Sequence, residues 1–444
     1  MSLALRYLLA AAWALIGADL ACANDQTTAY GPPGDAMQGA NSAAAELPKG
    51  IPLPLVEAVA IASREHPLVA RGLADRQSRR SNLRGARWSR FPSLIVEGLA
   101  VTQGNQIGAQ DGLAANVVLE QPLYTFGRIN GAIDAASASL ETSNYALGDT
   151  QMELALRTIA AYFDLALATR REEIMRRSLS QHEDLRETIR RRVIQQISPQ
   201  ADLELAISRT AQIEQELAAV AGLRSTSFSR LQELIGYAEL DLGGVPFFDP
   251  NLVLPPEADL VAMALECSPR LKAFRSTRKE LDAERRVARS RLFPQIVGQA
   301  STNEITGNRV GLAVRLQTGN GLSQFAAVDA AGALIVSAEF ELAANERDIR
   351  EQVRVDYLAF EAGRDRALAS LRATASSELV TDSYKRQFIA GRRTWLDVMN
   401  AVRESMSAAL TGADAELGAL AAYSRLAIRS CLWKAAPLGI EDEQ

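Results

Sequence analysis

The spacing of hydrophobic positions changes along this chain in a definite order. Residues 67–90 have the composition of a helix of roughly 24 residues, which ends at Phe91-Pro92 because proline disfavours helical geometry in the residue before it. Two stretches rich in apolar and β-branched residues follow, 93–103 and 116–124, and the segment 104–112, rich in Gly, Asn and Gln, joins them. This pattern predicts a β-hairpin directly after the helix.

A long helical segment comes next. Residues 129–196, and later 324–389, contain no proline and are rich in Ala, Leu, Glu, Arg and Gln, which are strong helix formers. About 68 helical residues would make a rod of about 100 Å. A turn and a returning helix are predicted after each: 196–199 with 200–235, and 390–393 with 395–432.

The whole order of elements occurs twice. Pro269 follows Pro67 by 202 positions, and in both copies a second proline, Pro92 or Pro294, lies 25 residues further on. Later matches are 195 positions apart: Asp134-Ala135-Ala136 with Asp329-Ala330-Ala331, and Asp202 and Ala206 with Asp397 and Ala401. We expect the difference of seven residues between Pro294 and Asp329, among the strands, because loops between strands tolerate changes in length.

We therefore interpret the chain as two copies of one elongated unit. In each copy, two shorter helices stacked end to end would cover one long helix, and a two-stranded hairpin would cap the pair. The predicted parts are a signal peptide (1–23), a flexible leader (24–50), a first repeat (51–242), a linker (243–258), a second repeat (259–433) and a C-terminal tail (434–444). A periplasmic coiled-coil scaffold or adaptor without a pore is the alternative, but it leaves the hairpins unexplained.

The first residues have the architecture of a secretory signal peptide. An n-region with a single charge precedes the apolar run 7–16, and the small-residue site Ala21-Cys22-Ala23 stands before Asn24. We expect cleavage after Ala23 and export of the chain. Lipidation of Cys22 is the alternative, although Asp19 occupies the position where such a site normally has an aliphatic residue.

Composition excludes several classes of function. The 48 basic and 53 acidic residues leave a formal net charge of -5, which gives no argument for a nucleic-acid partner. The mature chain has no run of about 20 apolar residues that would cross a bilayer as a helix. With two histidines and three cysteines, no zinc cluster or disulfide framework can be assembled, and no nucleophile or phosphate loop stands out. We expect no enzyme, no catalytic residue, no metal and no cofactor.

The histidines and cysteines are interpreted individually. His66 precedes a helix-start proline and His182 lies among polar residues, so both are predicted at the surface. Cys267 begins the second repeat's first helical stretch and Cys431 ends the last helix, which places both near the middle of the helical part. A disulfide between them is possible in an oxidising compartment, but two buried free thiols are the favoured interpretation.

The four predicted strands have roughly 9 to 11 residues each, the length that crosses a bilayer with tilt. The last strand alternates most clearly: the aliphatic set is Val310, Leu312, Val314 and Leu316, and the polar or small set is Arg309, Gly311, Ala313, Arg315 and Gln317. Four strands cannot close a barrel, and an open sheet edge is not tolerated in hydrocarbon. In a membrane, several chains would share one barrel, with Arg309, Arg315 and Gln317 facing a water-filled lumen. A soluble edge hairpin is the alternative.

Two further motifs stand at the starts of helices. Gln121-Pro122-Leu123-Tyr124-Thr125-Phe126-Gly127-Arg128 opens a long helix, and Gly391-x-x-Thr394-x-Leu396-Asp397-Val398 opens a returning helix. With the duplicated helix, Phe-Pro and hairpin, they resemble the TolC family of outer-membrane efflux and secretion channels over about 55–433. The resemblance implies a mainly α fold with a small β part: a homotrimer in which duplicated helical hairpins form a periplasmic tunnel and four strands per chain form a 12-stranded outer-membrane barrel.

By the same resemblance, the functional residues are those of a closed tunnel entrance. Asp397 and Asn400 match positions that project into the constriction, where a trimer would carry one ring of carboxylates and one of amides. An acidic ring favours cations. Asp202, Arg393 and Phe388 match positions whose contacts hold the entrance shut. The alternative role of Asp397 is to stabilise the first turn of its helix.

The resemblance also implies the function and its partners. The chain would be the exit duct of a tripartite efflux or type I secretion system, passively conducting small molecules or unfolded protein across the periplasm and outer membrane of a Gram-negative cell. A periplasmic adaptor protein and an inner-membrane pump or ABC transporter would dock at the tunnel tip and supply energy. The arginines 190–192 lie one turn before this tip, where they would meet an acidic adaptor, although charged runs on helices are usually solvated.

Overall fold

The computed structural model describes residues 50–101, 112–236, 244–303, 307–317 and 320–434. The predicted signal peptide, the leader up to residue 49, Cys22 and most of the predicted tail lie outside these residues. Within the part of the chain that is described, no helix is both long and apolar enough to span a membrane.

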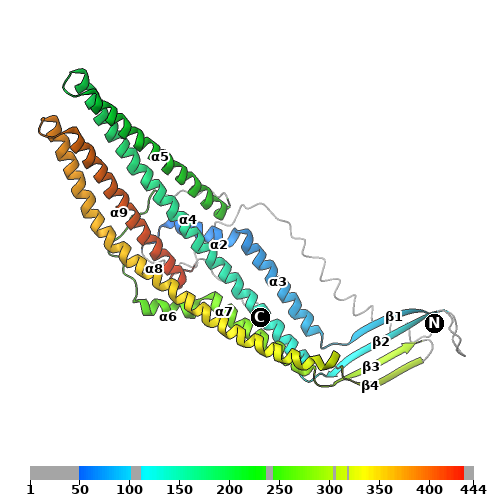
Figure 1. Ribbon diagram of the computed structural model, residues 1–444. Coiled ribbons are helices and arrows are strands. Elements are labelled where there is room, and N and C mark those ends of the chain that lie inside the picture. Colours follow the sequence, from blue (N-terminus) through cyan, green and yellow to red (C-terminus); the bar gives the residue numbers. More distant parts are fainter. Residues whose placement is uncertain (1–49, 102–111, 237–243, 304–306, 318–319, 435–444) are drawn as a thin grey trace. The chain divides into compact units, whose positions relative to one another are not determined.

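The described chain runs through one order of elements twice (Figure 1). The first repeat contains α2 (Leu53–Glu65), α3 (Pro67–Trp88), β1 (Ser93–Val101), β2 (Gly112–Tyr124), α4 (Arg128–Ile194) and α5 (Gln200–Ile235). The second contains α6 (Glu257–Cys267), α7 (Pro269–Ser290), β3 (Gln295–Asn303), β4 (Gly307–Arg315), the short 3-10 helix η2 (Asn320–Leu322), α8 (Ser323–Ile389) and α9 (Trp395–Arg429). The predicted helices and strands are confirmed, with bounds that differ by a few residues.

The lengths of the repeated elements agree closely. Helices α3 and α7 have 22 residues each, and α4 and α8 have 67 each, which corresponds to about 100 Å. Residues 102–111 separate the strands of the first hairpin and 304–306 those of the second, a difference of seven residues. The change in offset predicted between Pro294 and Asp329 therefore falls between β3 and β4.

Local signals explain where the repeated helices begin. Pro67 and Pro269 are the first residues of α3 and α7, where a proline costs no intrahelical hydrogen bond. The residue before each proline caps the helix: His66 Nδ1 accepts from the Leu68 N–H at 3.1 Å, and Ser268 Oγ accepts from the Leu271 N–H at 3.4 Å. The helices thus start at equivalent positions in both repeats.

The four strands form one antiparallel sheet in the order β1-β2-β3-β4. Its centre joins the two repeats, because β2 pairs with β3, with Glu120 opposite Gln299. Strands β1 and β4 are the edges of the sheet within the described residues. Helix α4 begins four residues after β2 ends at Tyr124, and α8 begins eight residues after β4 ends at Arg315, directly after η2.

Helix α4 is central to the helical part, because it packs against α2, α3, α5, α7 and α9. Helix α8 packs against α6, α7 and α9. The main hydrophobic core lies between these elements and contains the fully buried Tyr162 and Phe360. Burial raises the pKa of the Tyr162 hydroxyl to about 12.

A second hydrophobic cluster lies beside the turns where the two long helices end. Its buried members come from α4, α5, α8 and α9: Leu185, Ile189, Ala206, Phe388, Trp395, Val398, Met399 and Val402. We call it the tip cluster. It draws on both repeats, so the ends of the two helical hairpins are packed together within one chain.

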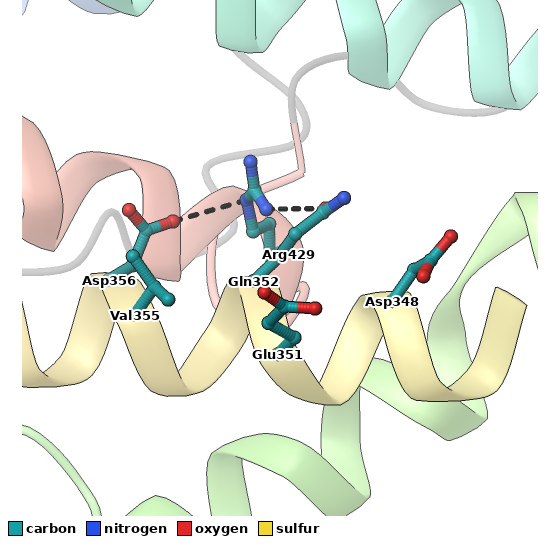
Figure 2. Close-up of a pocket in the computed structure, with 6 residues that line it drawn as sticks. All are labelled: Asp348, Glu351, Gln352, Val355, Asp356 and Arg429. Carbon is teal, nitrogen blue, oxygen red and sulfur yellow. Dashed lines mark hydrogen bonds and ion pairs between the residues drawn. The ribbon is translucent and has the colours of Figure 1, made fainter.

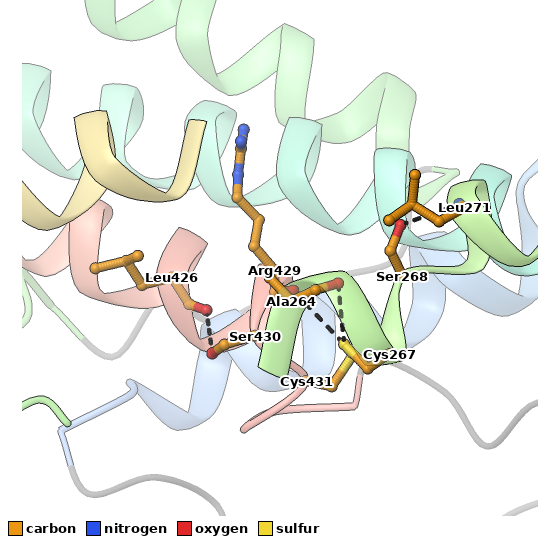
Figure 3. Close-up of a disulfide and its surroundings, with 8 residues drawn as sticks. All are labelled: Ala264, Cys267, Ser268, Leu271, Leu426, Arg429, Ser430 and Cys431. Atoms are coloured by element: carbon orange, nitrogen blue, oxygen red, sulfur yellow. Dashed lines mark hydrogen bonds between the residues drawn. A yellow bond between two sulfur atoms is a disulfide. The ribbon is translucent and has the colours of Figure 1, made fainter. Parts of the chain in front are cut away.

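Two predictions about single residues are wrong. Cys267 and Cys431 form a disulfide, with their Cα atoms 6.4 Å apart, and both are half-buried, so they are neither free thiols nor fully buried (Figure 3). His182 is buried, not at the surface, and its Nδ1 lies 2.8 Å from the Ser178 carbonyl oxygen. In both cases the outcome depends on which helix packs nearby, and a local pattern does not contain that information.

Candidate functional site

The sheet has one polar face, and the predicted lumen residues of β4 lie on it. Directly opposite residues of neighbouring strands share a face, so Arg315, opposite Gln295, is on the same face as Glu120, opposite Gln299. The Arg315 guanidinium spans β3 and binds the Glu120 carboxylate through two hydrogen bonds of 2.7 and 3.0 Å. Arg309 is exposed on this face, and Gln317 is exposed just beyond the end of the strand.

The opposite face of the sheet is apolar and exposed. Val310, Leu312 and Val314 expose 88%, 74% and 71% of their surface. Leu94, Val96 and Leu119 continue this face onto β1 and β2 and are also exposed. A sheet with one polar and one apolar face, both accessible, has no covering layer within its own described chain.

Aromatic side chains gather where the strands meet the helices. The Phe126 ring stacks on Phe293 with centroids 5.1 Å apart and meets Tyr124 edge-on at 4.6 Å. Trp88 and Phe91, at the end of α3, are also largely exposed. The apolar face of the sheet is therefore bordered by aromatic rings on the side of the helices.

Asp397, the predicted constriction residue, is part of a capping box at the start of α9. The Thr394 N–H and hydroxyl donate to Asp397 Oδ2 at 3.2 and 2.9 Å, and the Asp397 N–H donates to Thr394 Oγ1 at 3.2 Å. The Thr394 hydroxyl, followed by its backbone N–H, lowers the pKa of the Asp397 carboxyl. Asp397 is therefore a fixed, half-exposed negative charge at the tip.

The other predicted tip residues of the second repeat lie close to Asp397. Asn400 is exposed one helical turn further along α9, and its Oδ1 accepts from Arg403 at 3.3 Å. The Arg393 guanidinium stacks over the Tyr384 ring, 4.3 Å from its centroid, and lies 4.0 Å from the Asp397 carboxylate. Arg393 is thus held by neighbours in its own hairpin.

The predicted Asp202–Arg393 contact does not form within this chain, as far as the structure describes it. Asp202 lies in the first turn of α5, at the position equivalent to Asp397, but its helix begins after Pro199, which offers no side-chain cap. Its carboxylate has no hydrogen-bond or ion-pair partner among the described residues. Asp397 is tied to its backbone, whereas Asp202 is available for a partner outside the described chain.

Phe388 lies in the tip cluster with only 6% of its surface exposed. The Arg192 guanidinium lies over its ring, 4.8 Å from the centroid, and links α4 to α8. Arg190, in contrast, binds Glu187 on its own helix through two hydrogen bonds of 2.8 and 3.0 Å. Within the chain, Phe388 therefore holds the two hairpin ends together, and Arg192 is the member of the arginine run that contributes to this contact.

The capping box agrees with the alternative role predicted for Asp397, stabilisation of the first turn of its helix, and Thr394-x-x-Asp397 has the spacing of that motif. Sequence reasoning missed two features. Glu120 as the partner of Arg315 had no signal in the sequence, because the pairing register of β2 with β3 decides it. The second is an ionic group in which the buried Asp356 binds the half-buried Arg425 and Arg429; Figure 2 shows Asp356 and Arg429. Within the described residues, no group of His, Cys, Asp or Glu side chains is arranged to hold a metal.

The likeness to solved structures covers both repeats. The outer-membrane channel OprN aligns with a TM-score of 0.77 at 18% identity, over 86% of this chain and 91% of that one. VceC of Vibrio cholerae gives 0.74 at 14% identity, over 85% and 95%. CmeC of Campylobacter jejuni gives 0.74 at 12% identity, over 85% of both chains. These similarities establish a fold of duplicated long helical hairpins with a four-stranded sheet.

Residues 59–237, most of the first repeat, match the outer membrane efflux protein family. No curated protein matches the chain by sequence. With the fold shared across both repeats, the chain is similar to the outer membrane efflux proteins and to solved outer-membrane channels.

Proposed function

We propose that three copies of this chain assemble into a passive exit duct, with the sheets together forming a 12-stranded barrel in the outer membrane and the helices a tunnel in the periplasm. The observation that carries this proposal is the four-stranded sheet, which has two edges without a partner strand among the described residues, an apolar exposed face and a polar opposite face. An open edge leaves backbone N–H and C=O groups without partners, which hydrocarbon does not tolerate. Pairing β4 of one copy with β1 of the next removes both edges.

The two faces of the sheet support the same arrangement. The face with Val310, Leu312 and Val314 suits lipid, and the face with Arg309, Arg315 and Glu120 suits a water-filled lumen. The Arg315–Glu120 pair leaves Arg309 as an exposed cation on the lumen side. Tyr124, Phe126 and their aromatic neighbours lie where a girdle of rings would meet the inner surface of the outer membrane.

The helical hairpins then lead away from the membrane. Since α4 and α8 are about 100 Å long, their far ends lie deep in the periplasm, where an adaptor and an inner-membrane pump or ABC transporter would dock. Asp397 and Asn400 on α9 would form the rings of the entrance. The nature of the cargo, small molecules for efflux or unfolded protein for type I secretion, follows from the pump that is engaged.

The proposed duct is tested by fractionation and conductance. The native protein is expected in the outer membrane, with a trimer that resists detergent and separates on heating. Purified trimers are expected to give cation-selective steps in planar bilayers. A soluble monomer without conductance would contradict the duct and support the periplasmic scaffold instead.

Exchanging the rings tests the constriction. Asp397→Asn should lower cation selectivity, and Asn400→Asp, which adds a second ring of carboxylates, should raise it. Because Asp397 also caps α9, the circular dichroism spectrum of each variant serves as the folding control. Equal selectivity of both variants and the wild type would remove these residues from the constriction.

Removing a closing contact tests the gate. Arg393→Ala and Asp202→Ala should each raise single-channel conductance if the two side chains meet across neighbouring copies. Arg393→Lys retains the charge and is the matched control, which should stay near the wild-type value. Unchanged conductance in both alanine variants would contradict the gate assignment.

A further inference from the structure

The equivalent helices α3 and α7, which precede the strands of each repeat, differ in the helices that they contact. Helix α7 lies between the long helices of both repeats, because it packs against α4 and α8. Its side chains Leu271, Ser276 and Ala283 are buried. Helix α3 packs against α4 of its own repeat and contacts α2. The surface of α3 that corresponds to the α7–α4 contact is exposed within the described chain.

The contact between α7 and α4 contains three ion pairs. Arg286 Nη2 lies 3.0 Å from Asp134 Oδ2, Lys279 Nζ lies 3.0 Å from Glu141 Oε2, and Arg270 Nε lies 3.1 Å from Asp149 Oδ2. These pairs join different repeats. They are the contacts that would recur between neighbouring copies if the same relation continued around a ring.

Because the chain is an internal repeat, each residue of the α7–α4 contact has an equivalent residue on the exposed surface of α3 or α8. Helix α3 precedes α7 by 202 residues at both ends, and α8 follows α4 by 195 at both ends. Arg286 therefore corresponds to Arg84, and Asp134 corresponds to Asp329. The pair Arg286–Asp134 and its equivalent Arg84–Asp329 therefore have the same residue types. In each, an arginine is on the short helix and an aspartate is on the long helix.

Both members of this second pair are exposed in the described chain. Arg84 forms a hydrogen bond of 3.1 Å with Ser81 on its own helix, and Asp329 has no ion-pair partner within the described residues. The other two pairs are not repeated as charges. Gln77 and Val336 stand in place of Lys279 and Glu141, and Leu68 and Ala344 stand in place of Arg270 and Asp149. The exposed surfaces of α3 and α8 thus have complementary charges at one pair of positions, Arg84 and Asp329, near the sheet.

The backbone approach at the same level is repeated as well. A Cβ atom added to Gly131 on α4 would lie 2.9 Å from the Val287 side chain on α7, so this contact requires a small residue. The corresponding positions are Ala326 on α8 and Gly85 on α3. Gly85 has open space around its Cα atom within the chain. In the α7–α4 contact the glycine is on the long helix, whereas in the equivalent surfaces it is on the short helix α3. Both helix crossings therefore include a glycine.

We infer that α3 of one copy packs against α8 of a second copy in the register of the α7–α4 contact, with Arg84 paired to Asp329 and Gly85 next to Ala326. This inference rests on the proposed assembly and adds the residues and register of its interface. The exposed apolar side chains of α8 agree with a covered surface, since Phe340 exposes 74% of its surface and Leu334 and Val336 about half.

Cysteine cross-linking tests the register. The double variant Gly85→Cys with Ala326→Cys should form disulfide-linked dimers and trimers in outer-membrane vesicles under mild oxidation, whereas each single variant should remain monomeric on non-reducing gels. The matched control is Gly131→Cys with Val287→Cys, the equivalent positions inside one chain, which should lose both added thiols without any increase in mass. The native Cys267–Cys431 disulfide stays in place throughout.

Charge exchange tests the ion pair independently. Arg84→Glu and Asp329→Arg should each lower the temperature at which the trimer dissociates in detergent, and the double variant should restore it. An exposed pair shifts an equilibrium by up to about fivefold, and three equal pairs act together in a trimer, so each single reversal should weaken assembly by roughly 10- to 100-fold.

The outcomes separate this inference from the proposed function. Cross-links that need both cysteines, together with rescue by the double charge exchange, support the register. A wild-type trimer whose control cysteines react while Gly85→Cys with Ala326→Cys stays monomeric would overturn the register and leave the duct intact. A wild-type protein that is monomeric in the outer membrane would overturn both.

Discussion

The two repeats share one sequence of elements but differ in how much of each is covered. Helix α7 lies between two long helices, while its counterpart α3 packs against one. The second repeat is also more strongly fastened, by a disulfide, by an ionic group around the buried Asp356 and by a capping box. Equal secondary structure therefore does not mean equal stability, and the less covered surfaces of the chain are those that the proposed assembly would place against a neighbouring copy.

The difference is greatest midway along the long helices. Asp356 on α8 is buried and binds Arg425 Nε at 2.7 Å. Arg429 Nε lies 3.2 Å from the other carboxylate oxygen of Asp356 (Figure 2). Burial lowers the pKa of Arg429, and the Asp356 carboxylate opposes that effect. The equivalent of Asp356 in α4 is Ala161, a buried residue of the hydrophobic core. The second repeat has an ionic contact where the first has apolar packing.

Removing the central carboxylate should have the largest effect. Asp356→Ala leaves two arginines next to each other without their counter-ion, which should lower the free energy of unfolding by about 3–5 kcal/mol. Denaturant titration of the detergent-solubilised protein measures this change. The triple variant Asp356→Ala, Arg425→Met, Arg429→Leu removes all the charges and should recover most of the loss. A single variant as stable as the wild type would show that the ionic group is not what fastens α8 to α9.

Breaking the disulfide should have the next largest effect. Cys267 at the end of α6 is joined to Cys431 just after α9, across 164 residues (Figure 3). Cys267→Ser with Cys431→Ser should cost about 2–4 kcal/mol because the unfolded chain loses a constraint. Hydrogen exchange should then increase in α6 and the end of α9, and not in α2 and α5, which have no such bond. Reductant should destabilise the wild type and leave the double variant unchanged; equal sensitivity would contradict the assignment.

The capping box should give a smaller, local effect. Thr394→Ala removes the side-chain cap of α9 and should cost about 1 kcal/mol, with faster hydrogen exchange in the first turns of that helix. The matched change in the first repeat is Pro199→Ala, which removes no side-chain cap. Apart from the effect of losing the rigid proline ring, hydrogen exchange in the first turns of α5 should stay as in the wild type. Equal changes in exchange at both tips would show that the capping box does not distinguish them.

The smallest effect should be the dependence of stability on pH through His182. Burial lowers the pKa of this imidazole below its ordinary value of 6.5, with Glu216 acting in the opposite direction. Below about pH 6.5 the unfolded chain binds a proton that the folded chain refuses, so stability should fall as the pH decreases through this range. His182→Gln should flatten the profile between pH 6.5 and 5. An unchanged slope in this variant would assign the pH dependence to other groups.

The elements were predictable because their signals are local. Pro67 and Pro269 start their helices as expected, and the alternation in β4 placed Arg315 on one face and Val314 on the other. The internal repeat strengthened these signals, since two sequences had to agree. The positions of the prolines and the hydrophobic periodicity were therefore enough to predict the helices and strands.

The contacts between distant segments could not be predicted in the same way. The burial of His182, the disulfide of Cys267 and the position of Arg192 over Phe388 all depend on which faces of the helices meet. The role of Phe388 illustrates this limit: resemblance suggested a closing contact at an entrance, while the structure places the ring in the tip cluster. A helix sequence carries its own periodicity but not the identity of its neighbour.

The assembly itself is tested most directly by the native mass of the protein extracted from outer membranes in a mild detergent. The account predicts a complex of three chains, because three copies close the sheet edges and cover the exposed surfaces of α3 and α8. A mass corresponding to one chain, in a preparation that retains the helical content of the structure, would contradict it.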